Sequence, residues 1–164
     1  MRIVVCDTGP VLHLSEAGAL DLLEKTGDVL IPPTVDDEIA RHIHDWPSRR
    51  PSWIRVEAPQ HPVAARIAQW AALIDLGAGE MEALVLAKAH GADWVLTDDA
   101  AARVVATLLG IEVHGSLGVV LWAAARAHIT RETAVAILDR LAVSSLWISP
   151  AILAEAHRAL DALT

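Results

Sequence analysis

Short apolar runs that alternate with helical segments are the feature that most constrains the fold of this chain. Runs this short and this apolar are typical of strands that are buried on both faces of a sheet. Parallel neighbours need crossover connections, and helices are the usual ones. We therefore predict an α/β fold, a three-layer α/β/α sandwich with a parallel sheet, whose strands are residues 2–6, 29–31, 53–57, 94–96 and 111–113.

The spacing of apolar residues between these runs predicts the helices. A Thr-Val-Asp-Asp sequence at Thr34 to Asp37 fits a capping box, with Thr34 as the cap of the helix that follows. Gly91 ends the helix whose enclosed, apolar pattern begins at Glu80. The predicted helices are residues 11–25, 35–44, 63–74, 80–90, 97–109, 117–127, 131–141 and 150–163.

Length and charge limit the class of protein. A chain of 164 residues can bury one sizeable core, so we expect one domain spanning residues 1–164. No charge-free apolar run reaches the roughly 20 residues of a membrane span, and an acid at Asp7 interrupts any signal peptide, so we expect no membrane association and a cytoplasmic location. A net charge of −8 argues against a broadly basic surface for nucleic acid. It does not exclude a nuclease whose acidic site attracts phosphate only through bound metal.

Acidic residues follow two of the predicted strands. Asp7 ends the first strand, and Asp98 and Asp99 end the strand at residues 94–96. Glu38 and Glu80 lie in the first turns of two helices that begin at the same rim of the sheet, where active sites of parallel sheets collect. Acids that converge there repel one another unless a cation lies between them, and all-oxygen ligation suits Mg²⁺ and Mn²⁺. The pattern predicts a metal site that can activate water against a phosphodiester.

A structural explanation competes for each acid. A single acid in the first turn of a helix is more often a cap than a metal ligand. We expect Asp36 and Asp37 to serve only as caps and Glu82 to be solvated or paired. Of Asp98 and Asp99, we expect one to cap the following helix and the other to bind metal.

Four segments resemble, in the right order, the acidic motifs of PIN-domain proteins: residues 3–12, 31–39, 76–84, and 96–99 with Arg103. The first is a strand ending in Asp followed by Thr and a small residue. The third resembles a subgroup that has Gly-Glu where VapC-type ribonuclease toxins usually have Asp, and residues 115–119 continue like that subgroup. The resemblance covers nearly the whole chain.

Membership of this family would imply a PIN-like sheet and Mg²⁺- or Mn²⁺-dependent endoribonuclease activity. Many bacterial members are toxins of type II toxin-antitoxin pairs, are often homodimers, and are inhibited by a small antitoxin. The motifs imply that metal and RNA cleavage depend on Asp7, Glu38, Glu80 and Asp99, with Asp98 as the alternative to Asp99. Thr8 and Thr97 would position these carboxylates.

The segment at residues 41–55 combines cations with Trp46 and Trp53. It could grip RNA by charge and stacking. Two alternatives remain, a Pro-rich surface loop whose tryptophans pack down and a partner interface. The candidate RNA-binding residues are Arg41, Arg49, Arg50 and Arg103.

Other residues are assigned no chemistry. The eight histidines form no zinc pattern, and we interpret all of them as structural or surface residues. We expect the C-terminal helices with Trp122 and Trp147 to complete the core, although an exposed part of them could be a dimer face.

Two other functions compete with the ribonuclease. One is a catalytically inactive PIN-like module that binds RNA or a protein. It is disfavoured because all four acidic positions are occupied in this chain. The other is phosphotransfer on Asp7, which is weaker because the chain lacks the acidic pair of receiver domains after its first strand and the Asp-x-Asp of phosphatases at Asp7 to Gly9.

Overall fold

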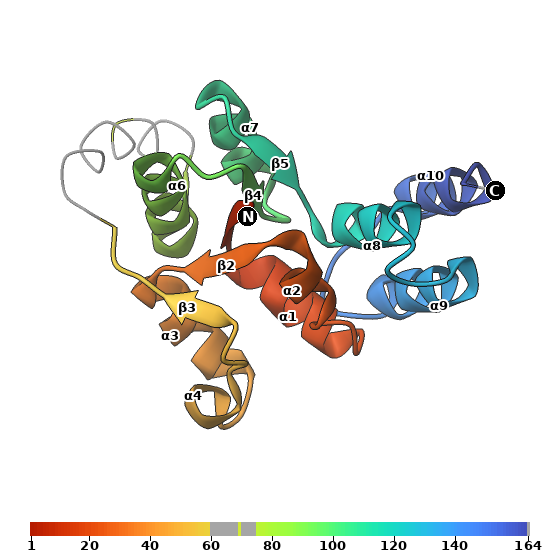
Figure 1. The fold of residues 1–164 in the computed structure, drawn as a ribbon, viewed down its shortest axis with the longest axis horizontal. Helices are drawn as coiled ribbons and strands as arrows, with labels where there is room; N and C mark the ends of the chain where they lie inside the picture. Colours follow the sequence, from red (N-terminus) through yellow and green to blue (C-terminus); the bar gives the residue numbers. More distant parts are fainter. Residues whose placement is uncertain (60–68, 70–74, 164) are drawn as a thin grey trace.

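A parallel sheet forms the centre of the protein in the computed structural model, which describes residues 1–59, 69 and 75–163 (Figure 1). Its strand order is β3-β2-β1-β4-β5, so β1 lies in the middle, with Val5 opposite Leu30 on one side and Val95 on the other. The strands are β1 (Ile3–Cys6), β2 (Asp28–Ile31), β3 (Ile54–Val56), β4 (Trp94–Leu96) and β5 (Glu112–His114). The predicted parallel α/β fold is confirmed.

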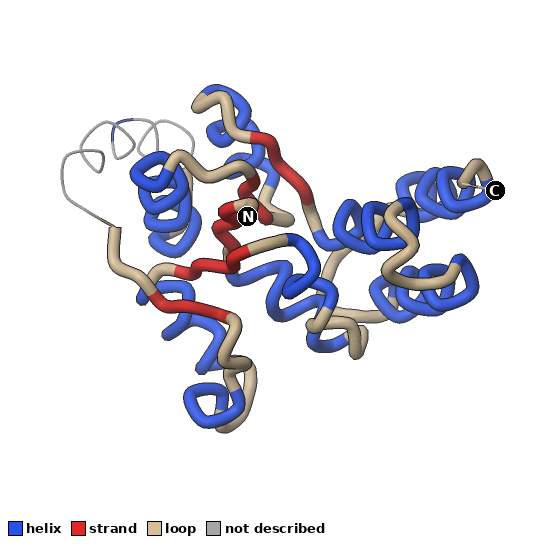
Figure 2. Tube along the Cα trace, viewed as in Figure 1, coloured by secondary structure: helices blue, strands red, loops and turns tan. Residues whose placement is uncertain are grey.

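Helices cover both faces of the sheet (Figure 2). Successive β1 residues point to opposite faces, so Val4 and Cys6 join one core and Val5 joins the other. The larger core contains α1 (Thr8–Glu16), α2 (Leu22–Thr26), α3 (Pro33–His42), α4 (Trp46–Arg49), α8 (Ser116–Ala125), α9 (Arg131–Ala142) and α10 (Pro150–Asp161). The smaller core contains α6 (Ala78–His90) and α7 (Ala100–Leu108). In the described part of the chain, no helix is both long and apolar enough to cross a membrane.

The helix predicted at residues 11–25 is wrong, because the chain breaks into α1 and α2. Gly18 takes a left-handed conformation with φ 64°, which glycine adopts without steric cost. The amides of Gly18 and Ala19 donate to the carbonyls of Ser15 and Leu14, which closes the end of α1. The helix predicted at residues 63–74 lies outside the described residues, except for Gln69.

The capping box at Thr34 is also wrong. The amide of Thr34 donates to Oε2 of Glu82 at 2.8 Å, so an acid from α6 satisfies the start of α3. Asp36 is not a cap either, because its two oxygens accept from Trp46 Nε1 at 2.7 Å and from Arg50 at 2.6 Å. Glu82, expected to be solvated or paired with a side chain, therefore links α6 to α3.

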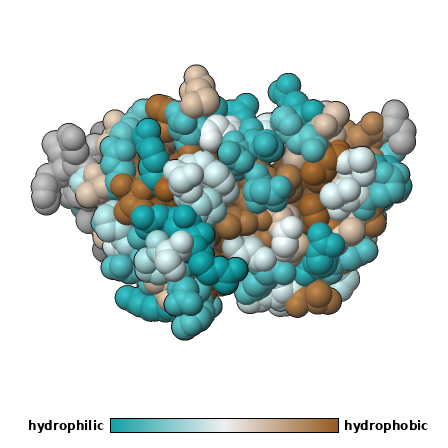
Figure 3. Space-filling view, turned by 60° about the horizontal axis from the view of Figure 1, so that its bottom comes forward, coloured by the Kyte–Doolittle hydropathy of each residue, from teal (hydrophilic) through white to brown (hydrophobic). Residues whose placement is uncertain are grey.

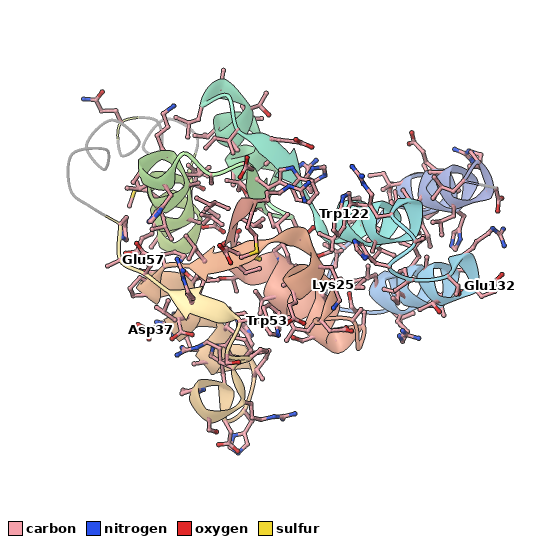
Figure 4. All side chains as sticks on the ribbon, viewed as in Figure 1. Lys25, Asp37, Trp53, Glu57, Trp122 and Glu132 are labelled. Carbon is pink, nitrogen blue, oxygen red and sulfur yellow. The ribbon has the colours of Figure 1, made fainter. Side chains whose placement is uncertain are left out.

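The C-terminal helices complete the larger core only in part. Trp122 lies at the junction of α8 with the sheet (Figure 4) and packs edge-on against Trp94, with ring centroids 5.5 Å apart. Trp147 is 84% exposed, so the expectation that it joins the core is wrong. The face of the molecule seen in Figure 3 is mainly hydrophilic, with hydrophobic side chains between the hydrophilic ones.

Candidate active site

The carboxylates predicted to form the site gather in one cleft at the carboxyl ends of β1 and β4. These two strands are neighbours in the sheet, so the residues that follow them emerge at the same edge. The helices α3 and α6 also begin near this edge, and each brings a glutamate. The cleft has a volume of about 460 Å³ and is lined by all five predicted carboxylates: Asp7, Glu38, Glu80, Asp98 and Asp99.

Asp7 is the deepest of these acids, and its side chain is nearly inaccessible, at 3% exposure. Its Oδ1 accepts from the amide of Thr8 at 2.7 Å, and its Oδ2 accepts from Thr97 Oγ1 at 2.9 Å. Burial and the charge of Glu80 nevertheless outweigh these bonds and, with Glu38 adding to them, raise the pKa of Asp7 from 3.8 to about 7. The cleft therefore holds more negative charge than its donors compensate.

Two glycines make room for the glutamates. Thr8 Oγ1 donates to Glu38 Oε2 at 2.5 Å, which holds that carboxylate beside the end of β1. A Cβ on Gly79 would lie 2.5 Å from the same Glu38 oxygen, and a Cβ on Gly77 would collide with the carboxylate of Glu80. The Gly-Ala-Gly-Glu sequence at the start of α6 thus supplies one acid and leaves space for both.

Asp98 and Asp99 have different environments although they are adjacent. Asp98 accepts from the amide and hydroxyl of Ser116, at 2.7 and 2.6 Å, and is 2.7 Å from His13 Nδ1. Burial raises the pKa of Asp98, but the bonds from His13 and Ser116 outweigh burial and leave that pKa below its ordinary value. Asp99 is exposed and caps α7 by accepting from the amide of Ala102 at 2.7 Å. The expectation that one of the pair is a cap is confirmed, and the cap is Asp99, the residue that the motif assigns to the metal.

Sequence reasoning missed both residues that bind the carboxylate of Asp98. His13 lines it from α1, whereas we interpreted every histidine as structural or surface. Ser116 is fully buried at the start of α8, directly after β5. Site residues in parallel sheets follow the carboxyl ends of neighbouring strands, which we call the strand-end rule. This rule could have found Ser116, because β5 is the neighbour of β4 in the sheet. No signal of that kind points to His13.

The cations of the 41–55 segment do not line the acidic cleft. Arg41 and Arg49 are exposed on α3 and α4, and Arg50 is paired with Asp36. Trp46 is 2% exposed and donates to the same carboxylate, so it offers no stacking surface. The interpretation in which this tryptophan packs down is the one that the structure supports.

Arg103, the fourth RNA-binding candidate, lies at the edge of the cleft. Its Nη1 donates to the carbonyl of Thr97 at 3.3 Å. The residue also lines a neighbouring pocket that shares Asp98 with the acidic cleft. Of the four predicted cations, it is therefore the one next to the carboxylates.

Comparison with known families agrees with this arrangement. A family model described as a PIN domain (DUF3368) matches residues 3–162. The chain belongs to the PIN domain family. No curated protein matches it. PIN domains are typically nucleases and generally use Mg²⁺, so the family accounts for an acidic cleft at this edge of the sheet.

The donor chemistry of this PIN domain fits a divalent cation. Mg²⁺ and Mn²⁺ prefer carboxylate oxygens, and the raised pKa of Asp7 marks a concentration of negative charge that a cation would relieve. Within residues 1–59, 69 and 75–163, no three His, Cys, Asp or Glu side chains stand in an arrangement that would ligate one ion. Glu80 lies against Gly77, so its carboxylate would have to turn to join a ligand set.

Proposed function

We propose that this PIN domain is a Mg²⁺- or Mn²⁺-dependent endoribonuclease that hydrolyses RNA phosphodiester bonds. The observation that carries the proposal is Asp7, a buried carboxylate held among other acids with a pKa raised to about 7. A purely structural cluster of acids is normally stabilised by hydrogen-bond donors or cations of the protein itself. The two hydrogen bonds that Asp7 accepts do not offset its burial and the neighbouring charges, as expected of a site that is completed by metal.

In this proposal Asp7, Glu38, Glu80 and Asp99 hold the metal. When bound, the cation would lower the pKa of a water molecule and neutralise charge on a phosphate oxygen. The hydroxyl of Thr97 fixes Oδ2 of Asp7, and the hydroxyl of Thr8 fixes Glu38. These bonds orient two carboxylates before metal arrives, which limits the reorganisation that binding requires.

Hydrogen bonding favours Asp99 over Asp98 as the fourth ligand. Both oxygens of Asp98 already accept from Ser116 or His13. Asp99 uses Oδ1 for the cap of α7, and its Oδ2 accepts no hydrogen bond from the described residues. We assign Asp98 the role of positioning the rim through His13 and Ser116.

The test is cleavage of structured and single-stranded RNAs by purified protein in Mg²⁺, Mn²⁺ or EDTA. We expect metal-dependent cleavage that Asp7→Asn abolishes. The matched control is Asp37→Asn, because Asp37 is an exposed acid next to Glu38 in the sequence (Figure 4) and does not line the cleft. Retained cleavage in Asp7→Asn would refute the assignment.

A second candidate is a PIN module that binds RNA or a protein without cutting. It is favoured by the lack, among the described residues, of three acids arranged for one ion. RNA binding without cleavage by folded protein that binds Mn²⁺ in calorimetry would select it.

We further propose, from membership of a family in which many bacterial proteins are toxins, that the protein is the toxin of a type II pair, active as a homodimer and inhibited by a small antitoxin. Expression in a bacterial host should arrest growth, and expression of Asp7→Asn should not. Equal growth of the two strains, with both proteins folded, would count against the toxin.

A further inference from the structure

Trp147 is a large aromatic side chain left almost fully exposed beside the acidic cleft. It is 84% exposed, yet it lines the same cleft as Asp7 and Glu80. A scattered exposed aliphatic residue needs no explanation, but an exposed tryptophan next to a polar site is typical of a binding surface. The position of Trp147, rather than its exposure alone, therefore points to a ligand.

The loop that carries Trp147 is bonded to α1 two residues before the tryptophan. It connects α9 to α10 and runs back from the C-terminal helices toward α1 (Figure 1). Ser145 donates to Glu16 at the end of α1 through its amide at 2.7 Å and through its hydroxyl at 2.9 Å. After the loop, Ser149 caps α10 and fixes where that helix begins. The bonds from Ser145 thus hold the loop at the cleft.

A second pocket, of about 330 Å³, adjoins the cleft on the other side of Trp147. The two hollows share Trp147, Leu146 and Asp98. Aliphatic side chains from α8 and α10, Leu117 and Ile152, form part of its wall, and Arg103 adds a guanidinium. Apolar walls with a few polar groups suit a flat ring that has apolar faces and polar edges.

The charge of this protein favours a contact of this kind. The net charge is −8 and five carboxylates line the cleft, so the protein's own charges repel phosphates there. Stacking of a base on an aromatic ring adds affinity that does not depend on charge.

We propose that Trp147 stacks on an unpaired base of the substrate next to the cleaved phosphate, and that the adjoining pocket receives this base. The inference rests on the proposed ribonuclease function and adds to it the side chain and the pocket that bind a base beside the cleaved phosphate. Bases inside a duplex are already stacked on their neighbours and cannot reach the ring. Arg103, which lines the adjoining pocket, contacts the phosphate between the stacked base and the cleft.

The test compares Trp147→Ala with the wild type on a single-stranded RNA and on the same sequence as a duplex. In Trp147→Ala, we expect KM for the single strand to rise about five-fold or more, while kcat changes little. In Trp147→Phe, which keeps an aromatic ring, KM should stay close to the wild-type value. Val143→Ala is the matched control, because Val143 lies in the same connection, is 85% exposed and lines neither hollow. Dissociation constants for the same single strand, measured by fluorescence anisotropy in the uncleaving Asp7→Asn background, give a readout independent of activity.

Two results would overturn the inference. One is an unchanged KM and dissociation constant in Trp147→Ala. The other is a shift of Trp147→Ala to a smaller species in light scattering without a change in RNA binding, since a second copy of the chain would then cover the ring. Failure of the proposed function is a different result: wild-type protein that cleaves no RNA with either metal, whatever Trp147 does to binding in the Asp7→Asn background.

Discussion

The ends of β1 and β4 lie side by side, yet their aspartates are stabilised in opposite ways. At the end of β1, burial and the charges of Glu80 and Glu38 raise the pKa of Asp7 to about 7. At the end of β4, Asp98 is also buried, but hydrogen bonds from His13 and Ser116 hold its pKa below 3.8.

The difference separates two functions of acids in one cleft. The protein supplies Asp98 with three donors, so that carboxylate is stable as an anion without any ligand. Asp7 receives two hydrogen bonds but faces other acids, so the protein compensates its anion only in part. At the end of β4, Asp98 is compensated by the protein's own donors, whereas at the end of β1 the charge of Asp7 is not.

The largest expected effect is on the stability of metal-free protein carrying Asp7→Asn. The folded-state pKa of Asp7 lies above its ordinary 3.8, so its contribution to stability is present below pH 4 and is lost as pH rises through 7. Asparagine cannot ionise. In EDTA, the free energy of unfolding of the variant, relative to that of the wild type, should rise by on the order of 4 kcal/mol between pH 4 and pH 8. Urea unfolding at each pH measures this difference.

Asp37→Asn is the control, because it removes one acid from the surface of the same molecule. It should show no comparable rise in relative stability with pH. If the difference in unfolding free energy between Asp7→Asn and wild type stays constant across this range, the folded protein does not disfavour the charged form of Asp7. The contrast between the strand ends would then disappear.

Asp98→Asn should change the stability in the opposite direction and by a smaller amount. Losing charge-assisted bonds to His13 and Ser116 should destabilise the protein by about 1.5–3 kcal/mol at pH 7. Because the folded pKa of Asp98 is depressed, its contribution is present above pH 4 and is lost as pH falls through that lowered value. The gap between variant and wild type should therefore close on acidification.

A second aspartate–histidine pair serves as the control for Asp98. Asp139 and His157 are 3.2 Å apart on the surface, where Asp139 is 63% exposed. Asp139→Asn should cost less than about 1 kcal/mol, since solvent screens exposed pairs. If the two variants lose the same free energy of unfolding, the hydrogen bonds to Asp98 stabilise the protein no more than an exposed ion pair does.

Much of the fold was predictable, because short apolar runs and helical spacing are local properties of the chain. The predictions failed where a distant residue decides the local structure. Glu82 of α6 takes the amide of Thr34, and no pattern within α3 can show that. The break between α1 and α2 likewise depends on the left-handed Gly18, which the leucine spacing on either side conceals.

The positions of the acids in the candidate site were predictable, but their environments were not. That Asp7, Asp98 and Asp99 share one cleft follows from the strand-end rule, because β1 and β4 are neighbours. Their different charge states do not follow from it, because His13 is 85 positions from Asp98 in the sequence. The cations of the 41–55 segment misled for a related reason, since Asp36 on α3 already binds Trp46 and Arg50.

The smallest expected effect tests the link between the two strand ends. Thr97 follows β4, donates to Asp7 Oδ2 at 2.9 Å and accepts from the amide of Asp99 at 3.1 Å. Thr97→Val keeps the shape and removes both bonds, so one oxygen of Asp7 is no longer oriented. We expect about ten-fold weaker Mn²⁺ binding in calorimetry, at the low end for residues that support metal ligands.

Thr107→Val separates this effect from the general cost of losing a threonine hydroxyl. Thr107 Oγ1 donates at 2.9 Å to the carbonyl of Arg103 within α7, on the exposed side of the helix. Removing it can change stability but touches no carboxylate, so Mn²⁺ affinity should stay at the wild-type value. If Thr97→Val binds Mn²⁺ as tightly as Thr107→Val does, the two strand ends are independent, and Asp7 is oriented by the amide of Thr8 alone.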